Sequence, residues 1–84
     1  MSYRLDFAAD ARLEWQALPI DVQELVLDML DSILDDPPSV DDHIAEAVND
    51  ATGFRRTIFI RMLIEHERAT ISVLGVGMAQ RSKL

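Results

Sequence analysis

Arginine is the residue type with the clearest potential for chemistry in this sequence, and most of the arginines lie in the last third of the chain. Residues 1–52 carry two arginines against thirteen acidic residues, a net charge of −11. Residues 53–84 carry six basic residues against two acidic residues, a net charge of +4. This asymmetry predicts one cationic surface that binds anions or an acidic protein. The six basic residues are Arg55, Arg56, Arg61, Arg68, Arg81 and Lys83.

Four of these residues are interpreted as a patch that binds RNA or a partner protein: Arg55, Arg56, Arg81 and Lys83. A chain of net charge −7 does not need additional cations for solubility, which favours a binding role. Arg61 has two interpretations of equal weight. It either acts on a ligand or forms a structural ion pair with a helix acid such as Asp28 or Glu14.

Several other chemistries are disfavoured. The chain has no cysteine, which excludes disulfides, thiolate metal sites and a cysteine nucleophile. His43 beside two aspartates is interpreted as a surface histidine. Asp28, Asp31 and Asp35 are interpreted as a solvated helix face, so no metal or cofactor is predicted. Gly75-Val76-Gly77 lacks the third glycine of a nucleotide-binding loop and predicts a bulge or a close backbone approach.

The first elements are a short strand and a short helix. Tyr3, Leu5 and Phe7 alternate with polar residues, which predicts a half-buried strand. Residues 8–18 are predicted to form a short helix with Ala9 and Leu13 on its inner side. Trp15 is expected in the core or in an interface.

A second helix is the clearest prediction. Its apolar residues recur at helical spacing without a miss: Val22, Leu25, Val26, Met29, Leu30, Ile33 and Leu34. Pro19 suits a first helical position, and Asp21 with Glu24 suggests a capping box. Pro37 and Pro38 end the helix, because each restricts the residue before it.

The remaining chain is predicted to contain a hairpin. Residues 37–53 are ambiguous, with either a short helix over 44–48 or a loop. Residues 57–64 and 70–76 are rich in β-branched and apolar residues and predict two strands at the centre of a sheet. His66 in the polar turn between them is expected to be a solvent-exposed linker residue.

Together these elements predict one α+β domain over residues 1–84, with two N-terminal helices packed on one side of a small antiparallel sheet. No signal peptide or apolar membrane span is found in the sequence, so we expect a soluble cytoplasmic protein with no membrane contact.

The order of these elements resembles the RelE/ParE superfamily of bacterial toxins, of which this chain would be a divergent member. The resemblance covers nearly the whole chain. It rests on five segments: Tyr3-Arg4-Leu5-Asp6-Phe7, residues 11–18 with Trp15, Ile33-Leu34-Asp35-Asp36-Pro37, Ile60-Arg61-Met62-Leu63-Ile64, and residues 71–77 leading to Arg81.

The resemblance implies a toxin of a type II toxin-antitoxin system, bound by a cognate antitoxin. Some members of the superfamily cleave mRNA on the ribosome without a metal, using the 2′-hydroxyl as nucleophile, and ParE-like members poison DNA gyrase. Arg61 corresponds to the mid-strand arginine of the family and, with Arg81, is the candidate catalytic residue. Arginine suits this role because its planar fork binds two phosphate oxygens at once.

The chain also departs from the family pattern. Met78 and Ala79 occupy positions where ribosome-dependent members carry cations, and the C-terminal tyrosine of some members is absent. Three functions therefore stay open: an mRNA endonuclease with a depleted catalytic cluster, a gyrase poison, and a catalytically silent binding module. The apolar surface exceeds what a small core covers, which predicts either a homodimer or an antitoxin helix in a groove.

Overall fold

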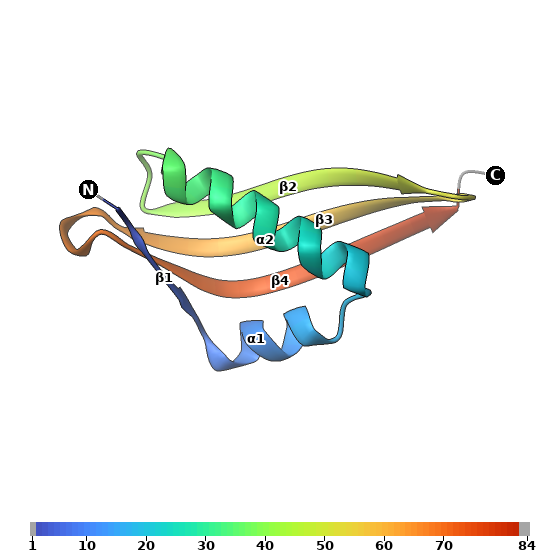
Figure 1. Ribbon diagram of the computed structural model, residues 1–84, viewed down its shortest axis with the longest axis horizontal. Helices are drawn as coiled ribbons and strands as arrows, with labels where there is room; N and C mark the ends of the chain where they lie inside the picture. The colour runs from blue at the N-terminus through green and yellow to red at the C-terminus, as the bar shows by residue number, and fades with distance from the viewer. Residues whose placement is uncertain (1, 83–84) are drawn as a thin grey trace.

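The computed structural model describes residues 2–82, which form two helices and a four-stranded sheet (Figure 1). In chain order the elements are β1 (Arg4–Phe7), α1 (Ala9–Gln16), α2 (Ile20–Asp35), β2 (Asp42–Ala51), β3 (Phe54–Glu65), the 3-10 turn η1 (His66–Arg68) and β4 (Thr70–Ser82). No helix in this part of the chain is long and apolar enough to cross a membrane.

The strands lie in the order β1-β4-β3-β2. β1 runs parallel to β4, and the other two pairs are antiparallel. The predicted α+β class is confirmed, but the predicted antiparallel sheet is only partly right. Alternation of apolar residues identifies β1 as a strand, yet it contains no information on the direction in which that strand joins the sheet.

β3 separates the two faces of the sheet by strict alternation. Phe54 at its start is exposed, and from residue 56 onward the even-numbered side chains are buried: Arg56, Ile58, Ile60, Met62 and Ile64. The four apolar ones form the core together with the inner sides of α1, α2 and β4. The odd-numbered side chains lie on the opposite side of the sheet, which we call the open face: Arg55, Thr57, Phe59, Arg61 and Leu63.

α2 packs across the sheet with the predicted stripe inward. Val22, Val26 and Leu30 are fully buried, and the other four stripe residues pack against the core. The helix ends at Asp35, before the two prolines, as predicted. The predicted start is wrong in detail: Pro19 precedes the first helical residue, and no side chain caps the helix.

α1 is rotated relative to the prediction. Ala11 is its buried residue, whereas Leu13 is 64% exposed, so the predicted inner side through Ala9 and Leu13 is wrong. Trp15 is half-buried as expected, with its ring edge-to-face against Phe7 and its indole N–H donating to the Gln23 carbonyl at 3.1 Å. The large indole sets which side of so short a helix turns inward.

β2 is the main element that the sequence did not reveal. Both alternatives for residues 37–53, a short helix or a loop, are wrong, because residues 42–51 pair with β3 over their full length. Its sequence, Asp-His-Ile-Ala-Glu-Ala-Val-Asn-Asp-Ala, contains few residues that favour strands on their own. The pairing with β3 overrides this weak local preference.

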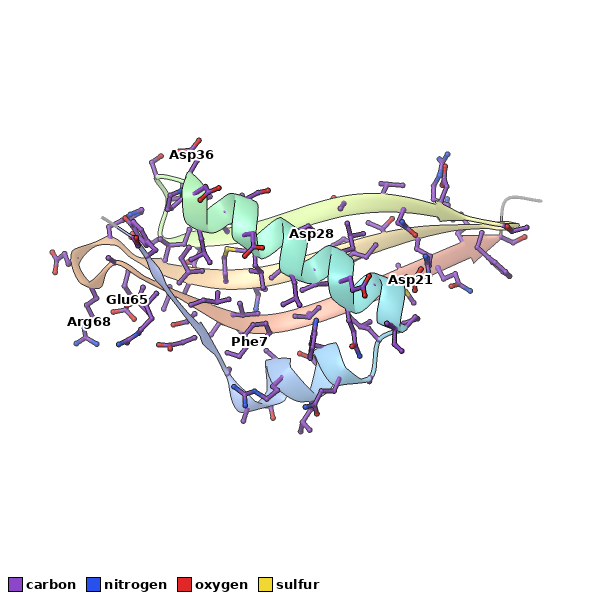
Figure 2. The ribbon with its side chains drawn as sticks, viewed as in Figure 1. Phe7, Asp21, Asp28, Asp36, Glu65 and Arg68 are labelled. Carbon is purple, nitrogen blue, oxygen red and sulfur yellow. The ribbon has the colours of Figure 1, made fainter. Side chains whose placement is uncertain are left out.

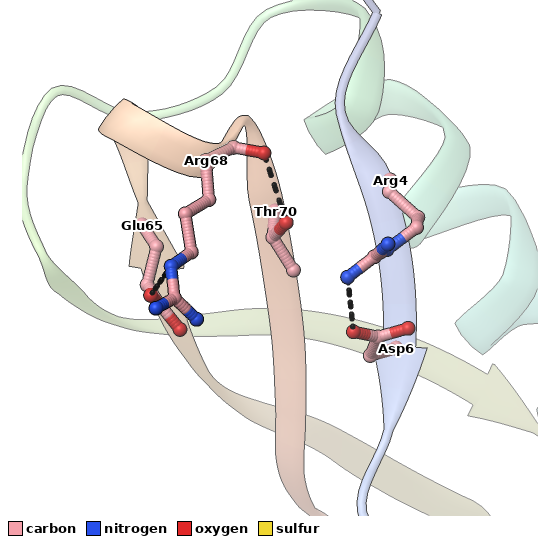
Figure 3. Close-up of polar contacts among 5 residues, drawn as sticks. All are labelled: Arg4, Asp6, Glu65, Arg68 and Thr70. Atoms are coloured by element: carbon pink, nitrogen blue, oxygen red, sulfur yellow. Dashed lines mark hydrogen bonds and ion pairs between the residues drawn. The ribbon is translucent and has the colours of Figure 1, made fainter.

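The hairpin between β3 and β4 is closed by a compact polar turn (Figure 3). Arg68 Nε lies 3.6 Å from a carboxylate oxygen of Glu65, and the Thr70 hydroxyl donates to the Arg68 carbonyl at 3.0 Å. His66 is exposed as expected, but it is more than a linker. Its Nδ1 forms a hydrogen bond of 2.7 Å with the Tyr3 hydroxyl, which connects the hairpin tip to the N-terminal segment.

Gly75 lies beside an irregularity in the β3–β4 ladder. Arg61 is opposite Gly75 and Met62 is opposite Val73, so Leu74 is the extra residue of a β-bulge. The Val76 amide donates to the Glu14 carboxylate of α1 at 3.3 Å. A bulge, one of the two alternatives expected for the glycine pair, is thus found at the residue immediately before it.

Candidate anion-binding site

Arg55 and Arg81 are brought together on the open face. Asp50, Arg55 and Arg81 occupy one row across β2, β3 and β4. Arg55 Nε donates to Asp50 Oδ1 at 3.2 Å, on the side of Arg55 away from Arg81. Both arginines are exposed. Because like charges directly opposite in a sheet repel each other, this pair of guanidinium groups favours an anion bound between them.

A hollow adjoins the arginine pair. It has a volume of about 340 Å³ and is lined by Arg55, Thr57, Ala79, Gln80 and Arg81. Thr57 and Ala79 form the row next to the two arginines. These short side chains leave space in which a phosphate or carboxylate group reaches both guanidinium groups. The arrangement is suited to bidentate binding of an oxyanion.

Arg56 lies on the opposite side of the sheet from Arg55. It is 8% exposed and donates to Asp21 of α2 at 2.6 Å. It also donates from Nε to Asn49 of β2 at 3.1 Å, with a second, short hydrogen bond to the same oxygen. The sequence predicts Arg56 as part of the binding patch. These contacts show instead that Arg56 connects β3 to α2 and to β2.

The contact with Arg56 changes the pKa of Asp21. The hydrogen bond from Arg56 lowers the pKa of Asp21 below its ordinary value of 3.8, and the attraction of the guanidinium charge acts in the same direction. Asp21 remains 62% exposed. An ion pair between a strand arginine and a helix acid, which was one of the two interpretations of Arg61, is thus formed by Arg56 with Asp21.

Arg61 is exposed on the open face, opposite Ile44 of β2 and Gly75 of β4. Among residues 2–82 no carboxylate forms an ion pair with it, although a hollow of about 550 Å³ is lined by Asp42, His43, Ile44 and Arg61. Asp28 lies midway along α2 (Figure 2), which packs on the other face. The structural interpretation of Arg61 is therefore wrong.

The structure does not bring Arg61 and Arg81 together. Arg81 is opposite Arg55, and Arg61 lies six residues further along β3. At a rise of about 3.3 Å per residue, this separation is about 20 Å. One phosphate group cannot touch both arginines. Lys83, the remaining basic residue of the predicted patch, is outside the described residues.

Sequence reasoning missed the partners of these arginines. Asp50 and Arg55 flank the turn that contains Gly53, and alternation within one hairpin is the signal that would have paired them. Asp21 and Asn49 are separated from Arg56 by a helix and by a strand that went unrecognised. Within residues 2–82 no group of three or more histidines and acids is arranged to hold a metal ion.

Comparisons with known proteins bear on the fold. No protein-family model matches the sequence, and no curated protein matches it. The isolated RelE toxin of E. coli superposes with a TM-score of 0.70 at 25% identity, over 98% of this chain and 89% of that chain. The chain has the RelE-like toxin fold. A chain of the intact E. coli RelBE toxin-antitoxin complex gives a TM-score of 0.69 at 25% identity, over 95% and 100% of the two chains.

The RelE-like fold extends to more distant structures. The RelBE2 toxin-antitoxin complex of Mycobacterium tuberculosis matches with a TM-score of 0.67 at 17% identity, over 94% of this chain and 100% of that chain. At that identity the likeness concerns the fold alone. The predicted resemblance to RelE toxins is thus confirmed by structures from more than one species.

Proposed function

We propose that this chain is the toxin of a toxin-antitoxin pair, bound by a cognate antitoxin. The observation that supports this proposal is the likeness over 95% or more of the chain to E. coli RelE, both as an isolated toxin and in the RelBE complex. Fold alone does not determine function, so the proposal also needs a site on this chain that suits the activity.

The proposed site is the hollow between Arg55 and Arg81, with an RNA phosphate as its ligand. Two guanidinium groups on neighbouring strands match the oxygens of one phosphate, and both remain charged at all physiological pH values. Arg61, about 20 Å along β3, is a separate contact for the same RNA strand on the open face. The target is mRNA on the ribosome.

Cleavage of RNA through its 2′-hydroxyl needs groups that accept and donate protons. Among residues 2–82 the hollow is lined by Arg55, Thr57, Ala79, Gln80 and Arg81, and none of these described residues is a histidine or carries a carboxylate. The nearest carboxylate in the same row, Asp50, is held by Arg55. These observations support a toxin that binds RNA with a weakened cleavage step.

The decisive experiment is tightly induced expression in a bacterial host, with mapping of new 5′ ends on translated mRNAs. We expect growth arrest that disappears in the double variant Arg55→Ala/Arg81→Ala and persists in Arg68→Ala, which removes an exposed arginine at the hairpin tip. Codon-phased cleavage would establish an active nuclease. Arrest without cleavage but with damaged DNA would point to gyrase, and normal growth would refute the toxin function.

A further inference from the structure

The outer edge of β2 is an unpaired strand edge of ten residues. β2 (Asp42–Ala51) is the last strand of the sheet order β1-β4-β3-β2, and it pairs with β3 on one side only. The other edge strand, β1, has only four residues. Figure 1 shows β2 along the margin of the sheet while α2 crosses its face. A long free edge is a template for pairing with another strand.

The backbone register shows which groups this edge offers. The Ile64 amide donates to the Asp41 carbonyl at 2.6 Å, immediately before β2 begins. Hydrogen-bonded and non-hydrogen-bonded pairs alternate in an antiparallel ladder, so the odd-numbered residues of β2 bond to β3. The amides and carbonyls of Ile44, Glu46 and Val48 therefore point outward from the sheet.

β2 carries three acidic residues, Asp42, Glu46 and Asp50, but lacks the other devices that usually protect a free edge. The strand contains no proline and no lysine, and its register with β3 is continuous over all ten residues. Ile44 and Val48 are 57% and 62% exposed. Exposed apolar side chains on a long, regular edge favour an interaction surface, and the acidic residues between them restrict which strand can pair there.

The side chains determine which strand fits. On the open face β2 presents acidic and apolar residues in turn: Asp42, Ile44, Glu46, Val48 and Asp50. A second copy paired antiparallel about Glu46 would place acid against acid. A register shift of two residues would place each acid against an apolar side chain. Neither arrangement is favourable, because cross-strand neighbours lie about 5 Å apart.

We infer that the outer edge of β2 binds an extended, basic segment of a partner protein, which adds a fifth strand to the sheet. Its open-face residues are alternately basic and apolar, so that cations meet Glu46 and its acidic neighbours while apolar side chains cover Ile44 and Val48. The net charge of −11 in residues 1–52 attracts such a segment at longer range. Assigning the segment to the antitoxin rests on the proposed function, whereas the edge itself does not.

The test uses a designed nine-residue peptide with the full chain. Lysine occupies positions one, five and nine, valine occupies positions three and seven, and threonine fills the even positions. Because outward-pointing residues of β2 form hydrogen-bonded pairs with an added strand, the lysine and valine amides of the peptide point toward β2. N-methylation of the two valines should abolish binding, and N-methylation of two threonines should leave it intact.

Amide hydrogen exchange followed by NMR locates the peptide. In the free protein we expect Ala45 and Ala47 to be protected, with Ile44, Glu46 and Val48 exchanging fast. The peptide should slow exchange of these three amides by tenfold or more. Equal binding of both methylated peptides, or protection of the three amides in the free protein, would overturn the inference.

A charge variant separates strand addition from general attraction. Glu46→Lys should weaken binding of the peptide at least tenfold, whereas Asp28→Lys, the same change of charge on the exposed side of α2, should leave the affinity within about threefold. Equal losses in the two variants would refute the docking position. If the protein binds the peptide at β2 but does not arrest growth on expression, the inference about the β2 edge is supported and the proposed toxin function is refuted.

Discussion

Arg81 of β4 lies directly opposite Arg55 of β3, and Arg61 lies six residues beyond Arg55 along β3. The two candidate catalytic residues of the sequence are therefore divided between two places on the open face. This register predicts which pairs of substitutions act together, because coupling is confined to residues that share a ligand or a contact.

The loss of RNA affinity should be non-additive for Arg55→Ala with Arg81→Ala and additive for Arg61→Ala with Arg81→Ala. The first pair holds one phosphate, whereas the second pair is about 20 Å apart. Each single loss of a phosphate contact should also reduce the slope of log affinity against log salt by about 1. Fluorescence anisotropy with a single-stranded RNA at several salt concentrations measures both quantities. Coupling between Arg61 and Arg81 would refute the two-place arrangement.

Arg61→Ala should leave the melting temperature within about 2 °C of the parent, because no described acid pairs with Arg61 and its side chain is exposed. Arg56→Ala should cost about 2 kcal/mol of unfolding free energy, since it removes a buried side chain with charged hydrogen bonds to α2 and β2. Urea denaturation of the two variants compares them directly. A large loss in Arg61→Ala would restore its structural interpretation.

Asp21 makes the stability of α2 dependent on pH. Its folded pKa is lowered by Arg56, so its contribution is present above the unfolded pKa of about 3.8 and is lost as the pH falls through the folded value. Asp21→Asn should therefore destabilise the protein at pH 7, and its difference from the parent should shrink below pH 4. Urea denaturation at pH 3 to 7 tests this, with Asp28→Asn as the control. A difference that is constant with pH would exclude the linkage.

The sequence predicts elements whose own apolar residues recur with a clear period. It does not predict an element whose formation depends on pairing with another strand. The seven apolar positions of α2 keep one period, so its length and inner face follow from the pattern. β2 has no such pattern, because Ala45 and Ala47 are small and Ile44 and Val48 face outward. β2 forms because it pairs with β3, and this pairing cannot be recognised from the residues of β2 alone.

The sequence predicts Arg55 and Arg81 as parts of one patch, but it does not separate Arg56 from them, for a related reason. Once β3 is known to begin at Phe54, alternation alone places Arg55 and Arg56 on opposite faces. The predicted strand began at residue 57, so this separation was hidden. The position of Arg81 depends further on the length of the hairpin and on the bulge at Leu74, which sequence periodicity does not determine.

Tyr3→Phe tests the attachment of the N-terminal segment to the hairpin tip. Removing the hydroxyl deletes its hydrogen bond to His66 and leaves the ring contact, whose centroids are 5.9 Å apart. We expect a loss of about 1 kcal/mol and faster exchange of the Arg4 amide, which donates to the Ala69 carbonyl at 2.7 Å. Unchanged exchange at Arg4 would show that β1 is held by its pairing with β4 alone.

The two hairpin turns should respond in opposite directions to exchanges of alanine and glycine. Ala69 adopts a left-handed conformation with φ of 47°, and Gly53 has φ of 80° with open space where a Cβ would lie. At a residue with left-handed backbone conformation, a Cβ lowers the stability of the folded state by about 1–2 kcal/mol relative to glycine. The greater conformational entropy of glycine in the unfolded chain partly offsets this difference. Ala69→Gly should therefore stabilise the protein by about 0.5–1 kcal/mol, and Gly53→Ala should destabilise it by about the same amount. Thermal unfolding of both variants gives the two signs, and a stabilising Gly53→Ala would contradict the left-handed turn between β2 and β3.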